Sequence, residues 1–288
     1  MITPRPDSVT TDLCRLHVGC TGSGPPVVLW HSLFVDSRSW GALVAALARD
    51  RTVYTIDGPS HGKSAPVHRD FTFEECAAAA VAALDGLGLA EPVDWVGNAW
   101  GGHIGVRIAA TEPSRLRTLT TIGTPIRAFT PREKWTKGWP LVGLYRFTGA
   151  TGFITRQLSD SLLGPESVAA KPDQAATIME SFRSADRNGM VHAMRSMMLR
   201  RAGIEDLLPR IAVPTLVMSV RDDVMGWRPG EARTTCAVIP DCRVEEVAGT
   251  GHISPLLIDR ERVLGLVTEF WASASGRADA KDADTPAV

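Results

Sequence analysis

The stretch VDWVGNAWGG, from Val93 to Gly102, decides the fold of this 288-residue chain. Its first residues are mostly apolar and favour a strand, whereas the residues from Trp100 to Thr111 have the spacing of a helix. A strand that turns into a helix this abruptly crowds its own backbone, which glycine tolerates best. The glycines at positions 97 and 101 therefore predict a sharp turn from strand to helix with Ala99 at its apex.

Short β-rich segments alternate with helical patterns on both sides of this turn. This alternation predicts an α/β fold, a mostly parallel sheet with helices on both faces. The predicted strands are Val27–Trp30, Thr52–Ile56, Val93–Val96, Leu116–Ile122, Thr215–Val220 and Arg243–Val247. The predicted helices are Trp40–Ala48, a helix from a capping box at Thr72 to Leu87, Trp100–Thr111 and Pro255–Trp271.

A long segment interrupts this alternation before the strand at Thr215. It contains four helical patterns: Trp135–Tyr145, Phe153–Leu163, Asp173–Ser184 and Asn188–Arg201. We therefore expect a first core part at 1–124, an inserted helical cap at 125–210 and a second core part at 211–273. Residues 274–288 contain no bulky apolar residue except the last, which predicts a disordered tail.

The composition narrows the class of protein. Lys and Arg total 31 and Asp and Glu total 32, so a net charge of −1 gives no reason to expect binding to nucleic acid or to an anionic membrane. Five scattered cysteines form no CxxC or Cys/His cluster, so no disulfide framework or zinc site is expected. The longest apolar run, Cys76–Leu84, is too short to cross a bilayer, and the first residues do not form a signal peptide. We expect a soluble cytoplasmic protein.

Four further motifs accompany the predicted turn: WHSLF at 30–34, DGPSHGKS at 57–64, PTLVMSVRDDV at 214–224 and GTGHIS at 249–254. Together with GNAWGG at 97–102, and in this order, they resemble the motifs of the α/β-hydrolase fold family. The resemblance covers nearly all of the chain outside the predicted tail. It implies an α/β-hydrolase fold whose nucleophile elbow is GNAWGG.

The resemblance also implies roles for individual residues. The implied site consists of Ala99 at the nucleophile position, the acid Asp223, the triad histidine His252, and an oxyanion hole formed by the backbone N–H groups of Leu33 and Trp100. Asp222 is the alternative acid. In such a site the histidine takes and returns a proton, and the carboxylate orients its ring.

Alanine at position 99 departs from the family pattern, because it has no oxygen or sulfur that could attack a substrate. Three interpretations are open. A parental serine or aspartate was replaced by alanine; or His252, oriented by Asp223, activates a water molecule or abstracts a substrate proton without a covalent intermediate; or the pocket binds a ligand without converting it.

Residues around the implied site have simpler expected roles. We expect His31 and His61 to support the oxyanion loop through hydrogen bonds, and His103 to be buried and hydrogen-bonded one helical turn beyond Ala99. Aromatic residues and methionines of the cap either pack it onto the core or roof an apolar pocket between the two parts. The aromatic residues and methionines in question are Trp135, Trp139, Tyr145, Phe147, Phe153, Phe182, Met190, Met194, Met197 and Met198.

The implied function is hydrolysis of an ester, a lactone or an activated carbon–carbon bond in a small apolar molecule, with no metal or organic cofactor. Two alternatives belong to other classes: a lyase or isomerase with His252 as its base, and a ligand-binding protein without catalysis. The motifs do not indicate an oligomeric state.

Overall fold

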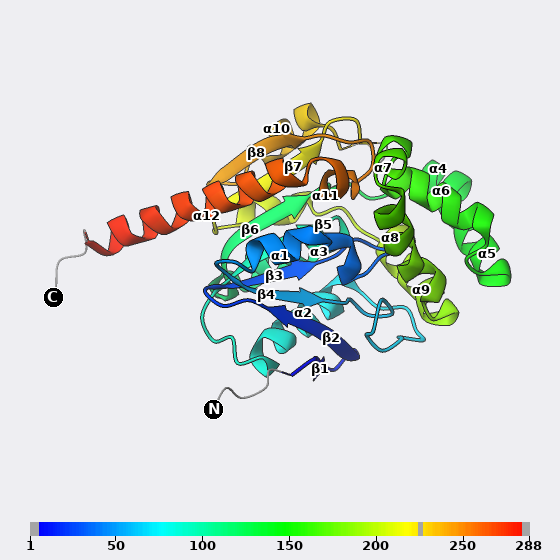
Figure 1. The fold of residues 1–288 in the computed structure, drawn as a ribbon, viewed down its shortest axis with the longest axis horizontal. Coiled ribbons are helices and arrows are strands. Elements are labelled where there is room, and N and C mark those ends of the chain that lie inside the picture. Colours follow the sequence, from blue (N-terminus) through cyan, green and yellow to red (C-terminus); the bar gives the residue numbers. More distant parts are fainter. Residues whose placement is uncertain (1–5, 224–226, 284–288) are drawn as a thin grey trace.

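Eight strands form one sheet in the order β1-β2-β4-β3-β5-β6-β7-β8 in the computed structural model, which describes residues 6–223 and 227–283 (Figure 1). The strands are β1 (Ser8–Thr10), β2 (Arg15–Thr21), β3 (Pro26–Trp30), β4 (Thr52–Ile56), β5 (Val93–Asn98), β6 (Leu116–Ile122), β7 (Thr215–Val220) and β8 (Cys242–Val247). The pairs from β4 to β8 are parallel, and those of β2 with β1 and β4 are antiparallel. The predicted mostly parallel sheet is confirmed.

Helices cover the two faces of this sheet, which explains why its central strands are buried along their whole length. Every residue of β4, β5 and β7 is buried. The helices α2 (Phe73–Gly86) and α3 (Trp100–Thr111) pack on each other, and α1 (Ala42–Leu47) packs against α12 (Arg260–Ala283) (Figure 1). The predicted capping box of α2 is present, since Thr72 and Glu75 exchange side-chain-to-backbone hydrogen bonds.

The strands β1 and β2 at one edge were not predicted from the sequence. In β2 only Leu16 and Val18 are fully buried, and the residues around them are half-buried or exposed. This alternation is short, with only Leu16, Val18 and the half-buried Cys20 on its apolar face, so the sequence pattern is weak there.

The segment between β6 and β7 forms a group of helices beyond one end of the sheet, and we refer to this group as the cap (Figure 1). Its elements are α4 (Pro131–Glu133), a π-helical turn (Lys134–Gly138), α5 (Trp139–Thr148), α6 (Gly152–Leu162), α7 (Pro165–Ala170), α8 (Pro172–Ser184), α9 (Arg187–Met194) and a second π-helical turn (Arg195–Leu199). The short helix α7 was not predicted. All the other predicted helical stretches of this segment are helical, with their ends shifted by a few residues.

The C-terminal region corrects one expectation. Residues 274–283, predicted to belong to a disordered tail, continue helix α12, which extends away from the sheet (Figure 1). This stretch is rich in alanine, which has the highest helix propensity. Residues 284–288 of the predicted tail lie outside the described residues. The predicted helix Pro255–Trp271 is divided at Asp259 into α11 (Ser254–Ile258) and α12. No helix within the described ranges is both long and apolar enough to cross a membrane.

Candidate active site

Ala99 lies at the turn between β5 and α3, with φ 46° and ψ −98°. A non-glycine residue with positive φ is strained, and such strain is concentrated at functional sites. A Cβ atom on Gly97 would collide with the backbone of Gly101, and one on Gly101 would collide with the carbonyl oxygen of Trp30. The two glycines predicted from the sequence are therefore required by the closeness of the helix to the sheet.

The backbone N–H groups of Leu33 and Trp100 have no protein acceptor among the described residues. Leu33, Trp100 and Ala99 all line one cavity. Because Trp100 is the first residue of α3, its N–H also carries the positive end of the helix dipole. The N–H of Phe34, by contrast, donates to Nε2 of His61 at 3.2 Å. These are the two N–H groups that the family resemblance implies as an oxyanion hole, and a pair of such donors stabilises negative charge on an oxygen atom.

His252 lies in the loop between β8 and α11, at the same edge of the sheet as Ala99, and contacts a carboxylate. Its Nδ1 is 3.2 Å from Oδ2 of Asp223, which follows β7, and both side chains are buried. Asp222, the alternative acid, is exposed. The structure therefore places Asp223 in the orienting position next to His252.

The position of His252 is held by its backbone. The side-chain N–H₂ of Asn98 donates to the carbonyl oxygens of His252 and Ile122, each at 2.9 Å. On another side Gly123, with φ 53°, approaches so closely that a Cβ there would lie 3.0 Å from Cα of His252. The loop with the imidazole is therefore attached to the same turn that carries Ala99.

Two buried imidazoles connect the loop of Leu33 to the loop that follows β4. Gly58 N–H donates to Nε2 of His31 at 2.8 Å, and Phe34 N–H donates to Nε2 of His61. Both rings also contact the indole ring of Trp100, with centroid distances of 5.6 and 5.0 Å. Burial lowers the pKa of both histidines, that of His61 to about 3. Neutral rings can accept these N–H groups, as the expected supporting role requires.

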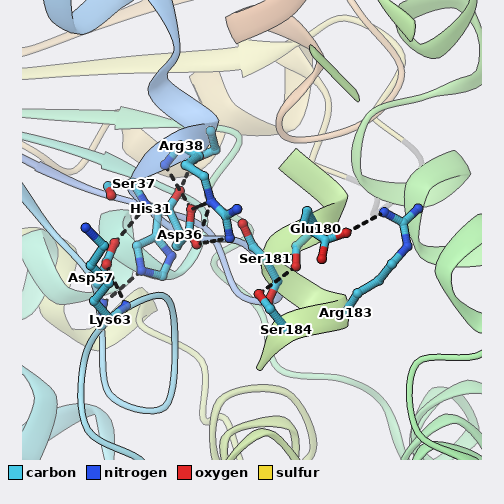
Figure 2. Close-up of polar contacts among 12 residues, drawn as sticks. His31, Asp36, Ser37, Arg38, Asp57, Lys63, Glu180, Ser181, Arg183 and Ser184 are labelled. Carbon is cyan, nitrogen blue, oxygen red and sulfur yellow. Dashed lines mark hydrogen bonds and ion pairs between the residues drawn. The ribbon is translucent and has the colours of Figure 1, made fainter. Parts of the chain in front are cut away.

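A carboxylate strengthens the same connection (Figure 2). Asp57 accepts the backbone N–H of Ser37 at 2.9 Å and that of Lys63 at 3.0 Å, so that it joins both loops. Asp36 begins the helical turn after the first loop and forms an ion pair with Arg38. The loop with the Leu33 amide is thus rigidly positioned before any ligand binds.

The cavity above Ala99 has a volume of about 210 Å³. This is smaller than the ~300–1,000 Å³ that is typical of sites for drug-sized ligands, and indicates a small ligand. His252 lines it as well, together with mainly apolar side chains: Phe73, Phe129, Leu141, Leu158, Leu162, Met197 and Met198.

The cap residues divide into three groups. Met197 and Met198 line the cavity, whereas Met190, Met194, Tyr145 and Phe182 are buried in the packing between the cap and the core. The expectation that the other aromatic residues could roof the pocket is wrong. Trp135, Trp139, Phe147 and Phe153 are 72%, 39%, 80% and 67% exposed, and none of them lines the cavity.

Two polar residues of the cavity wall are Arg201 and His103. The sequence predicted no role for Arg201 and a buried, hydrogen-bonded role for His103. Arg201, at the end of the cap, is buried and donates to the carbonyl oxygens of Pro125 at 3.0 Å and Arg127 at 2.8 Å. Its NH1 lies 2.9 Å from Nε2 of His103. Arg201 was missed because its surroundings in the sequence resemble no motif. Its only signal is a pair of arginines after an apolar helical run.

Burial also shifts the titration of this pair. The pKa of His103 lies well below its ordinary value because of burial and, to a smaller degree, the charges of Arg201 and Arg107. Burial lowers the pKa of Arg201 to about 10, so it is still charged at neutral pH. Within residues 6–223 and 227–283, no group of three or more His, Cys, Asp or Glu side chains is arranged to hold a metal ion.

Comparison with known proteins agrees with the fold. The model of the alpha/beta hydrolase family matches residues 27–265. A thermophilic esterase from Thermogutta terrifontis, solved with malate bound, is 25% identical and superposes with a TM-score of 0.84, over 94% of this chain and 99% of that one. The enol-lactonase from Burkholderia xenovorans is 24% identical, with a TM-score of 0.80 over 92% and 99% of the two chains, and shows the fold alone. A pimeloyl-[acyl-carrier protein] methyl ester esterase from Methylococcus capsulatus is 25% identical over 284 residues, which cover 90% of this chain and 99% of that protein.

Proposed function

The chain belongs to the alpha/beta hydrolase family, and from this premise we propose that it hydrolyses a small, mainly apolar ester or lactone in the cavity above Ala99. The observation that carries the proposal is that His252, paired with the buried Asp223, lines one cavity with Leu33 and Trp100, whose backbone N–H groups have no protein acceptor among the described residues. An activated carbon–carbon bond is a further candidate for the bond cleaved. Esters come first because two of the similar proteins are named esterases.

Alanine at position 99 requires a route without a covalent intermediate. In the proposed route His252 takes a proton from a water molecule, and the resulting hydroxide attacks the carbonyl carbon. The carbonyl oxygen becomes an oxyanion that the N–H groups of Leu33 and Trp100 stabilise. The tetrahedral intermediate then breaks its bond to the leaving oxygen, which takes the proton back from His252. Asp223 orients the imidazole and stabilises its charged form throughout.

The rate of this route is limited by its nucleophile. A triad that lacks one member retains about 10³–10⁴-fold acceleration over water from binding and the oxyanion hole. Activated esters such as nitrophenyl esters are therefore the substrates to test first.

The experiment compares 4-nitrophenyl butyrate hydrolysis by this chain and by Ala99→Ser. We expect slow hydrolysis by the chain and a large increase in kcat for Ala99→Ser, since the new hydroxyl is placed where His252 can deprotonate it. Ala48→Ser, a substitution at the end of α1, is the matched control for adding a hydroxyl group. Equal turnover by all three proteins would contradict the proposal.

A second candidate is a ligand-binding protein, or a lyase or isomerase in which His252 removes a substrate proton. The specific observation in its favour is the methyl group of Ala99 in an otherwise complete site. If Ala99→Ser stays inactive towards esters, lactones and carbon–carbon substrates while the cavity still binds small ligands, this second candidate is preferred.

A further inference from the structure

Arg201 is a buried cation that forms no ion pair with a carboxylate in the described part of the chain. Its exposed fraction is 8%, and the carbonyl oxygens and imidazole that it contacts are all uncharged groups. The comparably buried Arg107 instead pairs with Glu74 at 2.9 Å. Burying a charge without an opposite charge is costly, so a protein that retains such a residue usually uses it.

The hydrogen bonds of Arg201 leave donors unused. A guanidinium group has five N–H donors, and the hydrogen bonds of Arg201 to Pro125, Arg127 and His103 use three of them. The buried Nε atom has no partner. Because arginine can only donate, Nε2 of His103 must accept, and its proton is therefore on Nδ1. That Nδ1 atom is also buried and without a partner.

Arg201 and His103 both line the same cavity as Ala99 and His252. His103 lies one helical turn after Ala99 on α3. Arg127 and Lys137 line the cavity too, and Glu133 is the one acidic residue among the lining residues. With Arg201, the lining therefore has more positively than negatively charged side chains.

We propose that Arg201 and His103 bind a carboxylate group of the substrate, so that the substrate is a small molecule with an apolar body, a free carboxylate and, at the other end, the bond that is cleaved. A planar guanidinium matches a carboxylate in geometry and charge. This inference depends on the proposed function only for the bond that is cleaved. It replaces the expectation of a purely apolar substrate with that of an amphipathic one.

Arg201 also has a structural role that the test must separate. Its bonds to Pro125 and Arg127 join the two ends of the cap, so its substitution can weaken the fold. The test therefore measures a preference between two ligands in each variant, since a general loss of structure lowers both affinities together. Thermal unfolding of each variant accompanies the measurement.

The first experiment uses calorimetric titration of this chain with 3-phenylpropionate and with 3-phenylpropanamide, which differ only in the carboxylate. We expect the carboxylate to bind about 10- to 100-fold tighter. Arg201→Gln should abolish this preference, Arg201→Lys should retain part of it, and His103→Phe should reduce it. Arg200→Gln is the matched control, because it removes the same charge from the adjacent residue, which pairs with Asp70. Equal binding of the two ligands, no binding of either, or an unchanged preference in Arg201→Gln would overturn the proposal.

The second experiment distinguishes this inference from the proposed function. Ala99→Ser is assayed with mono(4-nitrophenyl) glutarate and with 4-nitrophenyl pentanoate, whose acyl chains have the same length but end in a carboxylate and a methyl group. We expect the KM for the glutarate to be at least about 10-fold lower than the KM for the pentanoate. If Ala99→Ser hydrolyses both esters with equal KM and the two titrated ligands bind equally, the carboxylate site is contradicted and the proposed hydrolysis is not. No hydrolysis of either ester, together with a carboxylate preference that requires Arg201, contradicts the proposed function alone.

Discussion

His31 and His61 each accept a backbone N–H group from the loop that carries the other. The donors are Gly58, 2.8 Å from His31, and Phe34, 3.2 Å from His61, and the ring centroids are 5.3 Å apart. Leu33 comes one residue before Phe34, so the hydrogen bond from Phe34 to His61 also fixes the backbone next to the N–H group of Leu33. Since an imidazole accepts such a bond only in its neutral form, the shape of the oxyanion loop depends on the protonation of two buried histidines.

Acid should destabilise the protein through these rings. Burial lowers the pKa of His61 from its ordinary value of 6.5 to about 3. Between these two values the unfolded chain binds a proton that the folded chain does not. The free energy of unfolding therefore falls by about 1.4 kcal/mol for each pH unit as the pH decreases. His31 and His103, whose pKa values are also lowered, add to this loss in the same direction.

Urea unfolding of the wild-type chain and of His61→Gln at pH 6.5 and pH 5 measures this effect. Glutamine offers an acceptor for Phe34 but does not titrate. The variant should lose about 2 kcal/mol less than the wild type between these pH values. The same loss in both proteins would show that the His61 ring is not held neutral.

Ala99→Gly should stabilise the fold. Residue 99 has φ 46°, where a Cβ atom is strained by about 1–3 kcal/mol. Glycine removes this strain but loses about 0.5–1 kcal/mol through chain entropy. We expect the free energy of unfolding to rise by about 1 kcal/mol, as measured by urea denaturation. Ala48→Gly, where φ is −67°, is the matched control and should be destabilised.

Asn98→Ala should weaken both the fold and the site. The side chain is completely buried, and its loss leaves two carbonyl oxygens, those of Ile122 and His252, without their donor. This costs about 1–3 kcal/mol in unfolding free energy. In the Ala99→Ser background, kcat for 4-nitrophenyl butyrate should fall as well, because the backbone of His252 is no longer attached to the turn. The exposed Asn188→Ala serves as the control and should leave both values unchanged.

Much of the fold could be predicted from the sequence, because the buried parallel strands are continuous apolar runs and the site motifs follow them directly. The turn at Ala99 is a clear example, since its glycines are required by local crowding. The strand β2, which lies next to the edge strand β1, and the helical continuation to Ala283 were not predicted. The strand has only two fully buried residues, and the continuation has no bulky apolar residue.

The part of the site that could not be predicted is the part that depends on tertiary packing. Arg201 is separated from Ala99 by the whole cap, and only folding brings it to the same cavity as His103. The choice between Asp222 and Asp223 likewise needed the orientation of the chain after β7, which exposes one carboxylate and buries the other. The opposite error concerns exposed aromatic residues such as Phe147. The sequence suggested that they roof a pocket, but in the structure they lie on the surface and do not line the cavity.

The central claim is that His252 acts as the base of this cavity. It is tested most directly by kcat/KM for 4-nitrophenyl butyrate in Ala99→Ser and in the double variant Ala99→Ser/His252→Gln. General acid–base catalysis contributes about 10²–10⁴-fold, so the double variant should be at least about 100-fold slower. Equal kcat/KM values in two folded proteins would contradict the claim.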